Sequence, residues 1–356
     1  MIKYRIAHEK DYQNINDFYN RIYSANRSLE SFYWEFHNGP FGESIYVIAE
    51  DGDKVVGTNC VIPILVTNGE GITYKTGKSE DTLVDPSYRG QKIFFKIYEY
   101  LIEVCKEKDI EVIWGFSSAN RVFEKIGFSV PFSGQKSLVV KSIPSAYRIM
   151  KGTKSWSMKG KIKILGMCLI GKSKLIFRKK AKLKKGLSVV TKPILDNTVQ
   201  GLVDRNLKIE DSLFGIKQTP AYQSWRLYDN PNYDKVHTYG ILDGENNLVA
   251  LVVLNSNKDK SANICQAIVD YQTLNNHDAV QIFKYVLEDL FKQGIVLIQD
   301  FVFSTNSLNE QELHNLGEAG FKHFKKGNGF VWKEIGEFNM KPENFYLSRM
   351  ATQGVN

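Results

Sequence analysis

Apolar and polar positions along the chain switch repeatedly between a period of two and a period of about 3.6, which predicts strands alternating with helices. The clearest helix is predicted over 92–107, and a second one of the same kind over 276–293. Apolar runs broken by a Gly-containing turn, typical of β-hairpins, occur at 46–57 and 239–253. The apolar stripe of the first helix consists of Ile93, Ile97, Leu101 and Cys105.

The two halves of the chain are weakly similar to each other. YWEFHNGP at 33–40 matches SWRLYDNP at 224–231 with identical spacing, so that Trp34 aligns with Trp225. Further strand and helix motifs match at an offset of 185 to 193 residues. The pattern predicts an α/β fold in which a mixed sheet flanked by helices (α+β) is built twice. We expect both tryptophans to be core residues of the repeat.

Charge is distributed unevenly and marks a connector between the halves. The chain has 356 residues, which is long enough for two domains, and its net charge is +8. No acidic residue lies between Glu124 and Asp196, whereas eighteen Lys or Arg residues do. We therefore place one domain at 1–145, a basic connector at 146–195 and a second domain at 196–356.

Composition and motifs exclude several classes of protein. The chain starts without the apolar stretch of a signal peptide and contains no run of about 20 apolar residues, so export and membrane spanning are not expected. Scattered cysteines favour reduced, buried thiols and a cytoplasmic location: Cys60, Cys105, Cys168 and Cys265. The six histidines show no HxH or HExxH spacing, and we expect no metal site.

The stretch VDPSYRGQKIF at 84–94 joins a strand to a helix. Pro86 cannot donate to a strand ladder, and Gly90 allows a tight turn directly before the helix. The unpaired N–H groups of a helix start attract anions, and Arg89 and Lys92 add positive charge there. The local pattern indicates a pyrophosphate site, with an ordinary β-to-α turn as the alternative.

Two blocks, EDTLVDPSYRGQKIFFKIYEYL at 80–101 and EVIWGFSSANRVFEKIGF at 111–128, resemble the core of the GNAT superfamily of acyl-CoA-dependent N-acyltransferases. The resemblance implies two GNAT-like domains in tandem and an acyl-CoA cosubstrate, acetyl-CoA or 3-hydroxybutanoyl-CoA. Two positions depart from the family pattern. Lys92 stands where a small residue is usual, and Phe123 replaces a Tyr that often protonates the departing thiolate.

The resemblance also implies where coenzyme A binds. The pantetheine arm would pair with the backbone at Leu83 and Val84, the pyrophosphate would lie over 89–94, and Asn120 would reach the arm. The full set of implied coenzyme A residues is Leu83, Val84, Arg89, Gly90, Gln91, Lys92, Ile93, Phe94, Asn120 and Phe123.

Glu80 and Asp81 are the candidates for the base that deprotonates an acceptor amine. Strand alternation predicts Glu80 on the face of Thr82 and Val84, and Asp81 on the opposite face. We prefer Glu80, although Asp81 or water chains could serve instead. His37 lies in the repeated Trp block and is either a contact to the acceptor or a packing residue.

The second half lacks a comparable pyrophosphate site. Its aligned segment, DYQTLNNHDAVQIF at 270–283, has neither glycine nor a basic residue, so we expect one acyl-CoA per chain. The chain end at 344–356 is expected to be a final strand with a polar tail, which either reaches a cleft or frays.

Among tandem GNAT enzymes, the chain looks most similar to those that acylate a nucleotide-linked amino-deoxy sugar, such as a dTDP-3-amino-3,6-dideoxyhexose for surface polysaccharide (O-antigen, lipopolysaccharide). Aminoglycoside, peptide and aminoacyl acceptors, and a non-catalytic binding protein, remain alternatives. For the connector, interdomain packing, weak contact with a membrane surface and attraction of a phosphorylated substrate all stay open. Nucleic-acid binding is disfavoured because few aromatics interleave with the lysines.

Overall fold

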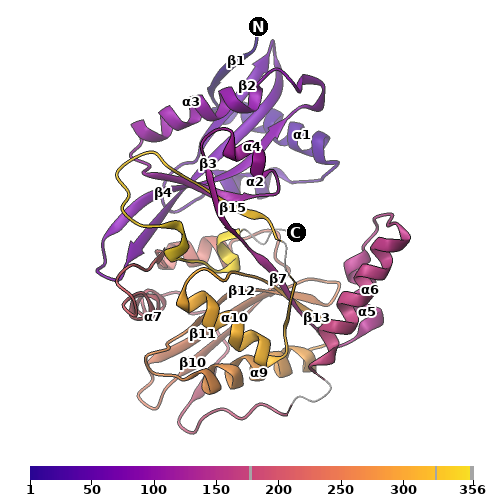
Figure 1. The fold of residues 1–356 in the computed structure, drawn as a ribbon, viewed down its shortest axis with the longest axis vertical. Coiled ribbons are helices and arrows are strands. Elements are labelled where there is room, and N and C mark those ends of the chain that lie inside the picture. Colours follow the sequence, from indigo (N-terminus) through magenta and orange to yellow (C-terminus); the bar gives the residue numbers. More distant parts are fainter. Residues whose placement is uncertain (176–178, 325–326, 353–356) are drawn as a thin grey trace.

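The computed structural model describes residues 1–175, 179–324 and 327–352. Two twisted mixed sheets lie one beyond the other along the long axis of the molecule, and helices pack on their faces (Figure 1). The architecture is therefore an α/β fold built twice, as the sequence predicts.

Each half supplies its elements in the same order. The first half contains β1 (Lys3–Ile6), α1 (Tyr12–Tyr23), α2 (Leu29–Phe36), β2 (Ile45–Asp51), β3 (Lys54–Asn68), β4 (Thr73–Val84), α3 (Ile93–Glu107), β5 (Val112–Ser117), α4 (Asn120–Glu124), β6 (Ser129–Ser133) and β7 (Gln135–Val140). The connector carries α5 (Ile143–Lys151) and α6 (Met158–Ser173). The second half contains β8 (Ser188–Val190), α7 (Thr198–Leu207), β9 (Phe214–Ile216), α8 (Pro220–Gln223), β10 (Lys235–Leu242), β11 (Leu248–Ser256), β12 (Ser261–Val269), α9 (Asn276–Lys292), β13 (Leu297–Val302), α10 (Ser307–Ala319), β14 (Lys322–Phe324), β15 (Gly329–Glu334) and β16 (Phe345–Tyr346).

The two sheets exchange one strand each. The first sheet runs β1-β2-β3-β4-β5-β15-β6, and the second runs β8-β10-β11-β12-β13-β7-β14. These orders are equivalent strand for strand, except that β7 completes the second sheet and β15 completes the first. Sheet membership thus crosses the boundary that the sequence suggests near residue 145.

The long helix α3 shows how sequence positions this framework. Its apolar stripe packs on β2 and β3, with Ile97, Leu101 and Cys105 fully buried. Gly57 on β3 makes room for the helix, since an added Cβ would lie 2.8 Å from the Ile93 Cγ2 atom. Close packing of α3 on the sheet fixes where its N-terminus opens.

Other sequence expectations concern thiols and membrane spanning. The four cysteines are free and buried, which confirms the prediction of buried thiols. Within residues 1–175, 179–324 and 327–352, no helix combines the length and apolar character needed to cross a membrane.

A reciprocal contact between two tryptophans joins the halves. The Trp34 indole N–H donates to the Trp225 carbonyl at 2.6 Å, and the Trp225 indole N–H donates to the Trp34 carbonyl at 2.6 Å. The rings lie 6.0 Å apart and are 5% and 4% exposed. The prediction that both are repeat-defining core residues is confirmed.

We expect Trp34→Phe to lower the free energy of unfolding by about 1–3 kcal/mol, because it leaves the Trp225 carbonyl buried without its donor. Urea titration followed by circular dichroism measures the loss. Trp156→Phe is the matched control, since Trp156 is exposed and its removal should change stability by less than about 0.5 kcal/mol. Equal stability of the two variants would show that the reciprocal pair contributes nothing.

Candidate active site

The turn between β4 and α3 has the geometry that the sequence motif predicts. A 3-10 turn, η2 (Pro86–Tyr88), follows β4, and the Asp85 carboxylate caps it by accepting a hydrogen bond from a backbone amide at 3.0 Å. Gly90 has φ +84° and Lys92 has φ +59°. The chain therefore passes twice through left-handed backbone, which suits glycine but strains the lysine.

The start of α3 is free to attract an anion. Its first turn contains no acidic residue, and its N-cap residue makes no side-chain cap. Arg89, Gly90, Gln91 and Lys92 are exposed around the unpaired amides of this turn. The Ile93 side chain is buried in the core, so only its amide can face a ligand.

We call the exposed turn at 89–92 and the first amides of α3 the cradle. Next to the cradle, β4 and β5 separate. They pair in parallel only where Thr76–Lys78 face Val112–Trp114. Beyond this point, no described strand pairs with β4 on its β5 side. Leu83 and Val84 lie on this unpaired edge, whose backbone groups can pair with an extended ligand arm.

The helix α4 borders the same region. Asn120 begins α4, and its side-chain oxygen is buried without a hydrogen-bond partner among the described residues. The Phe123 ring packs against Phe94 at 5.6 Å and Tyr98 at 5.4 Å. Phe123 is thus a core side chain and supplies no hydroxyl.

Sequence reasoning missed a cluster of hydroxyl groups on the α3 side of β4. The Tyr98 hydroxyl lies 2.8 Å from Ser79 Oγ and 3.1 Å from Thr82 Oγ1. Burial raises the Tyr98 pKa to about 12, so the phenol keeps its proton at neutral pH. No motif signals this cluster, because its members are separated along the chain.

A bulge at Asp81 overturns the predicted placement of the two carboxylates. Asp81 has φ +52°, and the register of β4 with β3 shifts between Thr58 and Cys60. The prediction that Glu80 and Asp81 lie on opposite faces is wrong, because the bulge interrupts strict alternation. The charges of both carboxylates act on the same residue, Glu35 of α2.

Asp81 is held rigidly. Both terminal nitrogens of Arg27 lie 3.1 Å from its Oδ2 atom, and the Tyr46 hydroxyl donates to the same oxygen. Its side chain is 3% exposed. Asp81 therefore has the surroundings of an anchoring residue.

Glu80 is more accessible than Asp81. Its side chain is 26% exposed, and its Oε1 atom lies 2.6 Å from the Lys78 ammonium. Burial lowers the pKa of Lys78. Glu80 thus keeps a partly exposed carboxylate at the unpaired part of β4.

Sequence reasoning also missed Glu35 on α2. Burial, followed by the charges of Glu80 and Asp81, raises its pKa to about 7. A carboxyl group with such a pKa exchanges protons readily at neutral pH. The available signal was a single acidic residue inside the apolar run of the repeated Trp block.

His37 lies outside this cluster of carboxylates. It is exposed at the end of α2, and its Nδ1 atom lies 3.8 Å from Glu43. Its ring contacts Tyr12 and Tyr33. Its described contacts therefore connect it to α1 and α2 and not to Glu80.

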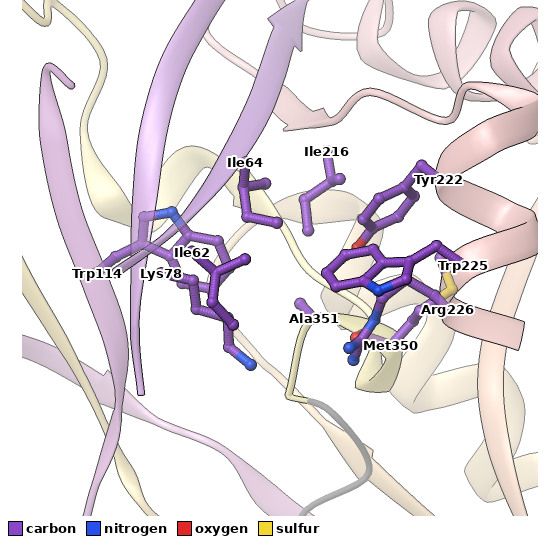
Figure 2. A pocket seen from close by; sticks show the side chains of 10 residues that line it. All are labelled: Ile62, Ile64, Lys78, Trp114, Ile216, Tyr222, Trp225, Arg226, Met350 and Ala351. Carbon is purple, nitrogen blue, oxygen red and sulfur yellow. The ribbon is translucent and has the colours of Figure 1, made fainter. Parts of the chain in front are cut away.

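A small cavity lies between the first sheet and the π-helical turn η3 (Ser224–Tyr228) (Figure 2). Lys78 borders it on one side, and Tyr222, Trp225 and Arg226 border it on the other. It thus brings two buried cations and aromatic rings close to β4.

Arg226 is 3% exposed, and its guanidinium group lies 5.0 Å from the Trp225 ring centre. One terminal nitrogen donates to the Met350 carbonyl at 2.7 Å. The other has no hydrogen-bond partner among the described residues. A hydrogen-bond acceptor in this cavity would satisfy it.

Comparisons with known proteins agree with this geometry. Residues 3–130 match the family model described as acetyltransferase (GNAT) domain. This part of the chain is therefore similar to GNAT acetyltransferase domains. The expected enzyme class, an acyl-CoA-dependent N-acyltransferase, is confirmed at that level. No curated protein matches the chain significantly.

Solved structures share the fold over most of the chain. A GCN5-related N-acetyltransferase from Anabaena variabilis is 13% identical with a TM-score of 0.62, covering 94% of this chain and 73% of that one. A tandem GNAT protein from the clavulanic acid pathway is 12% identical with a TM-score of 0.57, covering 95% and 100%. A glucosamine N-acetyltransferase region of a fungal GH3 β-N-acetylglucosaminidase is 11% identical with a TM-score of 0.58, covering 93% and 38%. The tandem GNAT-like fold expected from the sequence is confirmed.

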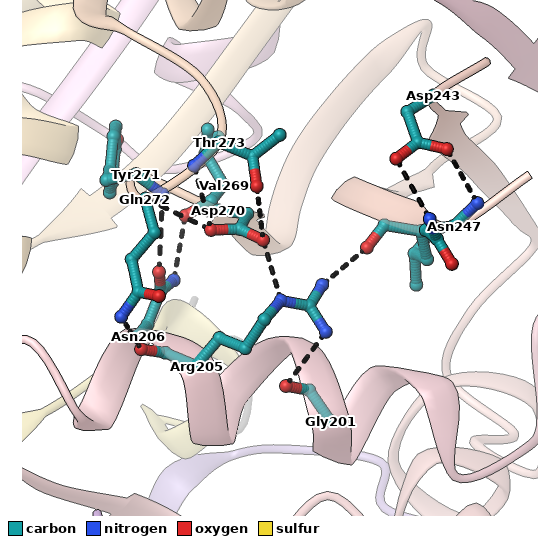
Figure 3. A network of polar contacts seen from close by, with 11 residues as sticks. Gly201, Arg205, Asn206, Asp243, Asn247, Val269, Asp270, Tyr271, Gln272 and Thr273 are labelled. Atoms are coloured by element: carbon teal, nitrogen blue, oxygen red, sulfur yellow. Dashed lines mark hydrogen bonds and ion pairs between the residues drawn. The ribbon is translucent and has the colours of Figure 1, made fainter. Parts of the chain in front are cut away.

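The second GNAT-like half keeps the anchor of the cradle. Arg21 on α1 lies 3.0 Å from Asp85 in the first half, and Arg205 on α7 lies 2.6 Å from Asp270 in the second (Figure 3). Asp270 also accepts hydrogen bonds from backbone amides of the turn that follows it. This shared ion pair ties the first helix of each half to the strand end.

The helix start that follows is different in the second half. Asn275 caps α9 by accepting a hydrogen bond from the Asp278 amide at 3.0 Å, and the Asp278 carboxylate returns a contact to the Asn275 amide. The helix therefore carries its own cap and its own negative charge. The start of α9 is therefore a much weaker anion site than the start of α3.

The chain's own C-terminal segment packs beside β12. The Tyr346 hydroxyl donates to the Ala267 carbonyl at 3.3 Å, and the turn η5 (Arg349–Thr352) packs against β12 and β13. A final strand, β16, is present, whereas the end of the polar tail at 353–356 lies outside the described residues. Within the part of the chain that the structure describes, no group of three or more His, Cys, Asp or Glu side chains could hold a metal ion.

We expect Gly90→Glu to abolish the thermal stabilisation that acetyl-CoA gives the wild-type protein. The new carboxylate would repel the pyrophosphate, and residue 90 requires positive φ. Gly186→Glu is the matched control, because Gly186 also has positive φ (+91°) and open surroundings but lies in the basic connector. Differential scanning fluorimetry compares the variants. Retained stabilisation in Gly90→Glu would exclude the cradle as the pyrophosphate site.

Proposed function

We propose that this GNAT protein transfers an acyl group from acyl-CoA to the amine of a nucleotide-linked amino-deoxy sugar. A dTDP-3-amino-3,6-dideoxyhexose represents the acceptor class, and acetyl or 3-hydroxybutanoyl is the acyl group. The product would enter surface polysaccharide synthesis, including the O-antigen of lipopolysaccharide, in the cytoplasm.

The observation that carries this proposal is the position of the carboxylate cluster. Glu80 lies just beyond the point where β4 leaves β5, and its charge acts on Glu35 of α2. Its ion-pair partner Lys78 borders the cavity that Arg226 also lines. An acceptor that carries both an amine and negative charges matches this pairing of carboxylates with buried basic side chains. A protein of the same fold is named as acting on glucosamine, which supports an amino sugar as the acceptor.

Coenzyme A would bind with its pyrophosphate on the amides of α3, between Arg89 and Lys92. Its pantetheine arm would pair with the edge at Leu83 and Val84, close to Asn120. Ile93 contributes an amide, whereas Phe94 and Phe123 form the apolar floor. A backbone N–H near Val84 would polarise the thioester carbonyl.

The amine nitrogen attacks the thioester carbonyl carbon after Glu80 accepts its proton. The carbon–sulfur bond then breaks, and the electron pair leaves on sulfur as a thiolate that must be protonated. Glu80 suits the base because it is partly exposed, whereas Arg27 and Tyr46 hold the buried Asp81. Since Phe123 has no hydroxyl, the cluster around Tyr98 is the protein's candidate proton source.

We expect Glu80→Gln to lower kcat by about 10²–10⁴-fold, because glutamine cannot accept the ammonium proton. Steady-state kinetics with acetyl-CoA and the preferred amine measure the effect. Glu103→Gln, the same change at an exposed position on α3, should retain wild-type turnover. Unchanged kcat in Glu80→Gln would remove Glu80 from the role of base.

We expect kcat/KM of the wild-type enzyme to fall as the pH drops below about 7. The raised pKa of Glu35 means that it takes up a proton in this range, which withdraws one negative charge from the site of proton transfer. In Glu35→Gln, this titrating group is absent, so the acid limb of the pH profile should move to lower pH. An identical profile would show that Glu35 does not control the reaction.

A panel of amines tests the acceptor directly. Mass spectrometry of products from nucleotide-linked amino sugars, free amino sugars, aminoglycosides and peptides should show acylation of the nucleotide-linked class, with acetyl- or hydroxybutanoyl-CoA as donor. Acylation of free aminoglycosides or peptides alone would replace the acceptor while retaining the enzyme class. Failure of every thioester to bind would instead favour a non-catalytic binding protein.

A further inference from the structure

The helical hairpin of the connector projects from one edge of the second sheet (Figure 1). Its second helix, α6, packs one side against β7. Ile164, Cys168 and Gly171 form that side and are buried. Gly171 is required by close packing, since an added Cβ would lie 2.3 Å from a methyl carbon of Leu138. The inner face of α6 is therefore fully used by the fold.

The outer face of α6 is apolar as well. Met158, Ile162, Leu165 and Leu169 recur at the spacing of one helix stripe and are 70%, 63%, 43% and 51% exposed. Trp156, directly before the helix, is 38% exposed, whereas the other four tryptophans are buried. A contiguous exposed apolar surface of this kind usually marks a binding face.

Lysines flank this outer stripe on both sides. At 100° per residue, Lys159 and Lys163 lie along one flank, and Lys161 and Lys172 lie along the other. Residues 125–195 contain eighteen basic residues and no acidic one. The rest of the chain has 29 basic and 39 acidic residues, so positive charge is concentrated in the segment of sequence that contains α6.

We propose that the outer face of α6 docks the protein on the surface of an anionic lipid bilayer. An apolar stripe between rows of lysine, with a tryptophan at its end, matches the apolar and anionic layers that such a surface presents. A second copy of the chain is a poorer occupant, because a symmetric contact would bring the lysine rows together. This inference is independent of which amine the enzyme acylates.

The direct test is co-sedimentation of the full-length protein with lipid vesicles. We expect binding to vesicles of phosphatidylcholine mixed with phosphatidylglycerol, much weaker binding to phosphatidylcholine alone, and loss of binding as salt increases. Trp156 reports insertion, since its emission should shift to shorter wavelength and be quenched by brominated lipid. Trp156→Phe should remove this shift, because the emission of the four buried tryptophans should not change on vesicle binding.

Paired variants separate docking from general hydrophobicity. Ile162→Gln/Leu169→Gln should weaken vesicle binding by about tenfold or more, because two inserting side chains become polar. The control Ile72→Gln/Ile209→Gln also replaces two exposed branched apolar side chains by glutamine, but away from α6, and should bind as the wild type does. Circular dichroism and stabilisation by acetyl-CoA should be unchanged in both, which keeps this test separate from that of catalysis.

Three results would overturn the proposal. The first is absence of wild-type binding to the anionic vesicles. The second is equal vesicle binding by the Ile162→Gln/Leu169→Gln variant and its control. The third is a wild-type dimer in light scattering that this variant converts to monomer, since that result would assign the stripe to self-association.

Discussion

The exchange of β15 into the first sheet is the constraint on which the arrangement of the active site depends. On its β4 side, β5 stops pairing after Trp114, yet on its other side it stays paired with β15 as far as Ser117. The strand from the second half thus holds β5 where it diverges from β4. The unpaired edge of β4, along which the acyl donor is proposed to lie, therefore depends on a segment more than 200 residues away in sequence.

A second contact between the halves lies close to the candidate site. The reciprocal bonds of Trp34 and Trp225 bring α2 and η3 together, and with them Glu35 and Arg226. Both halves have the anchoring Arg–Asp pair, but their helix starts differ: α3 offers uncapped amides with added positive charge, whereas α9 is capped by Asn275. The halves thus share a scaffold while differing in the local chemistry at one helix start.

Patterns of side chains predicted the features that arise locally. The repeated Trp block, the helices and the turn at Gly90 follow from spacing and residue type, and the structure has all of them. The strand exchange could not be predicted, since the apolar sequence of β15 suits either sheet. The bulge at Asp81 also escaped prediction, because strict alternation fits the sequence of β4 equally well. Glu35 was missed because its raised pKa comes from neighbours that only the fold assembles.

The central claim is that a duplicated scaffold retains a single acyl-CoA site, at the α3 cradle. Isothermal titration calorimetry of the wild-type chain with acetyl-CoA, in the absence of an acceptor, tests it most directly. The account predicts a stoichiometry of one acetyl-CoA per chain. Two equivalents per chain, or no binding at all, would contradict it.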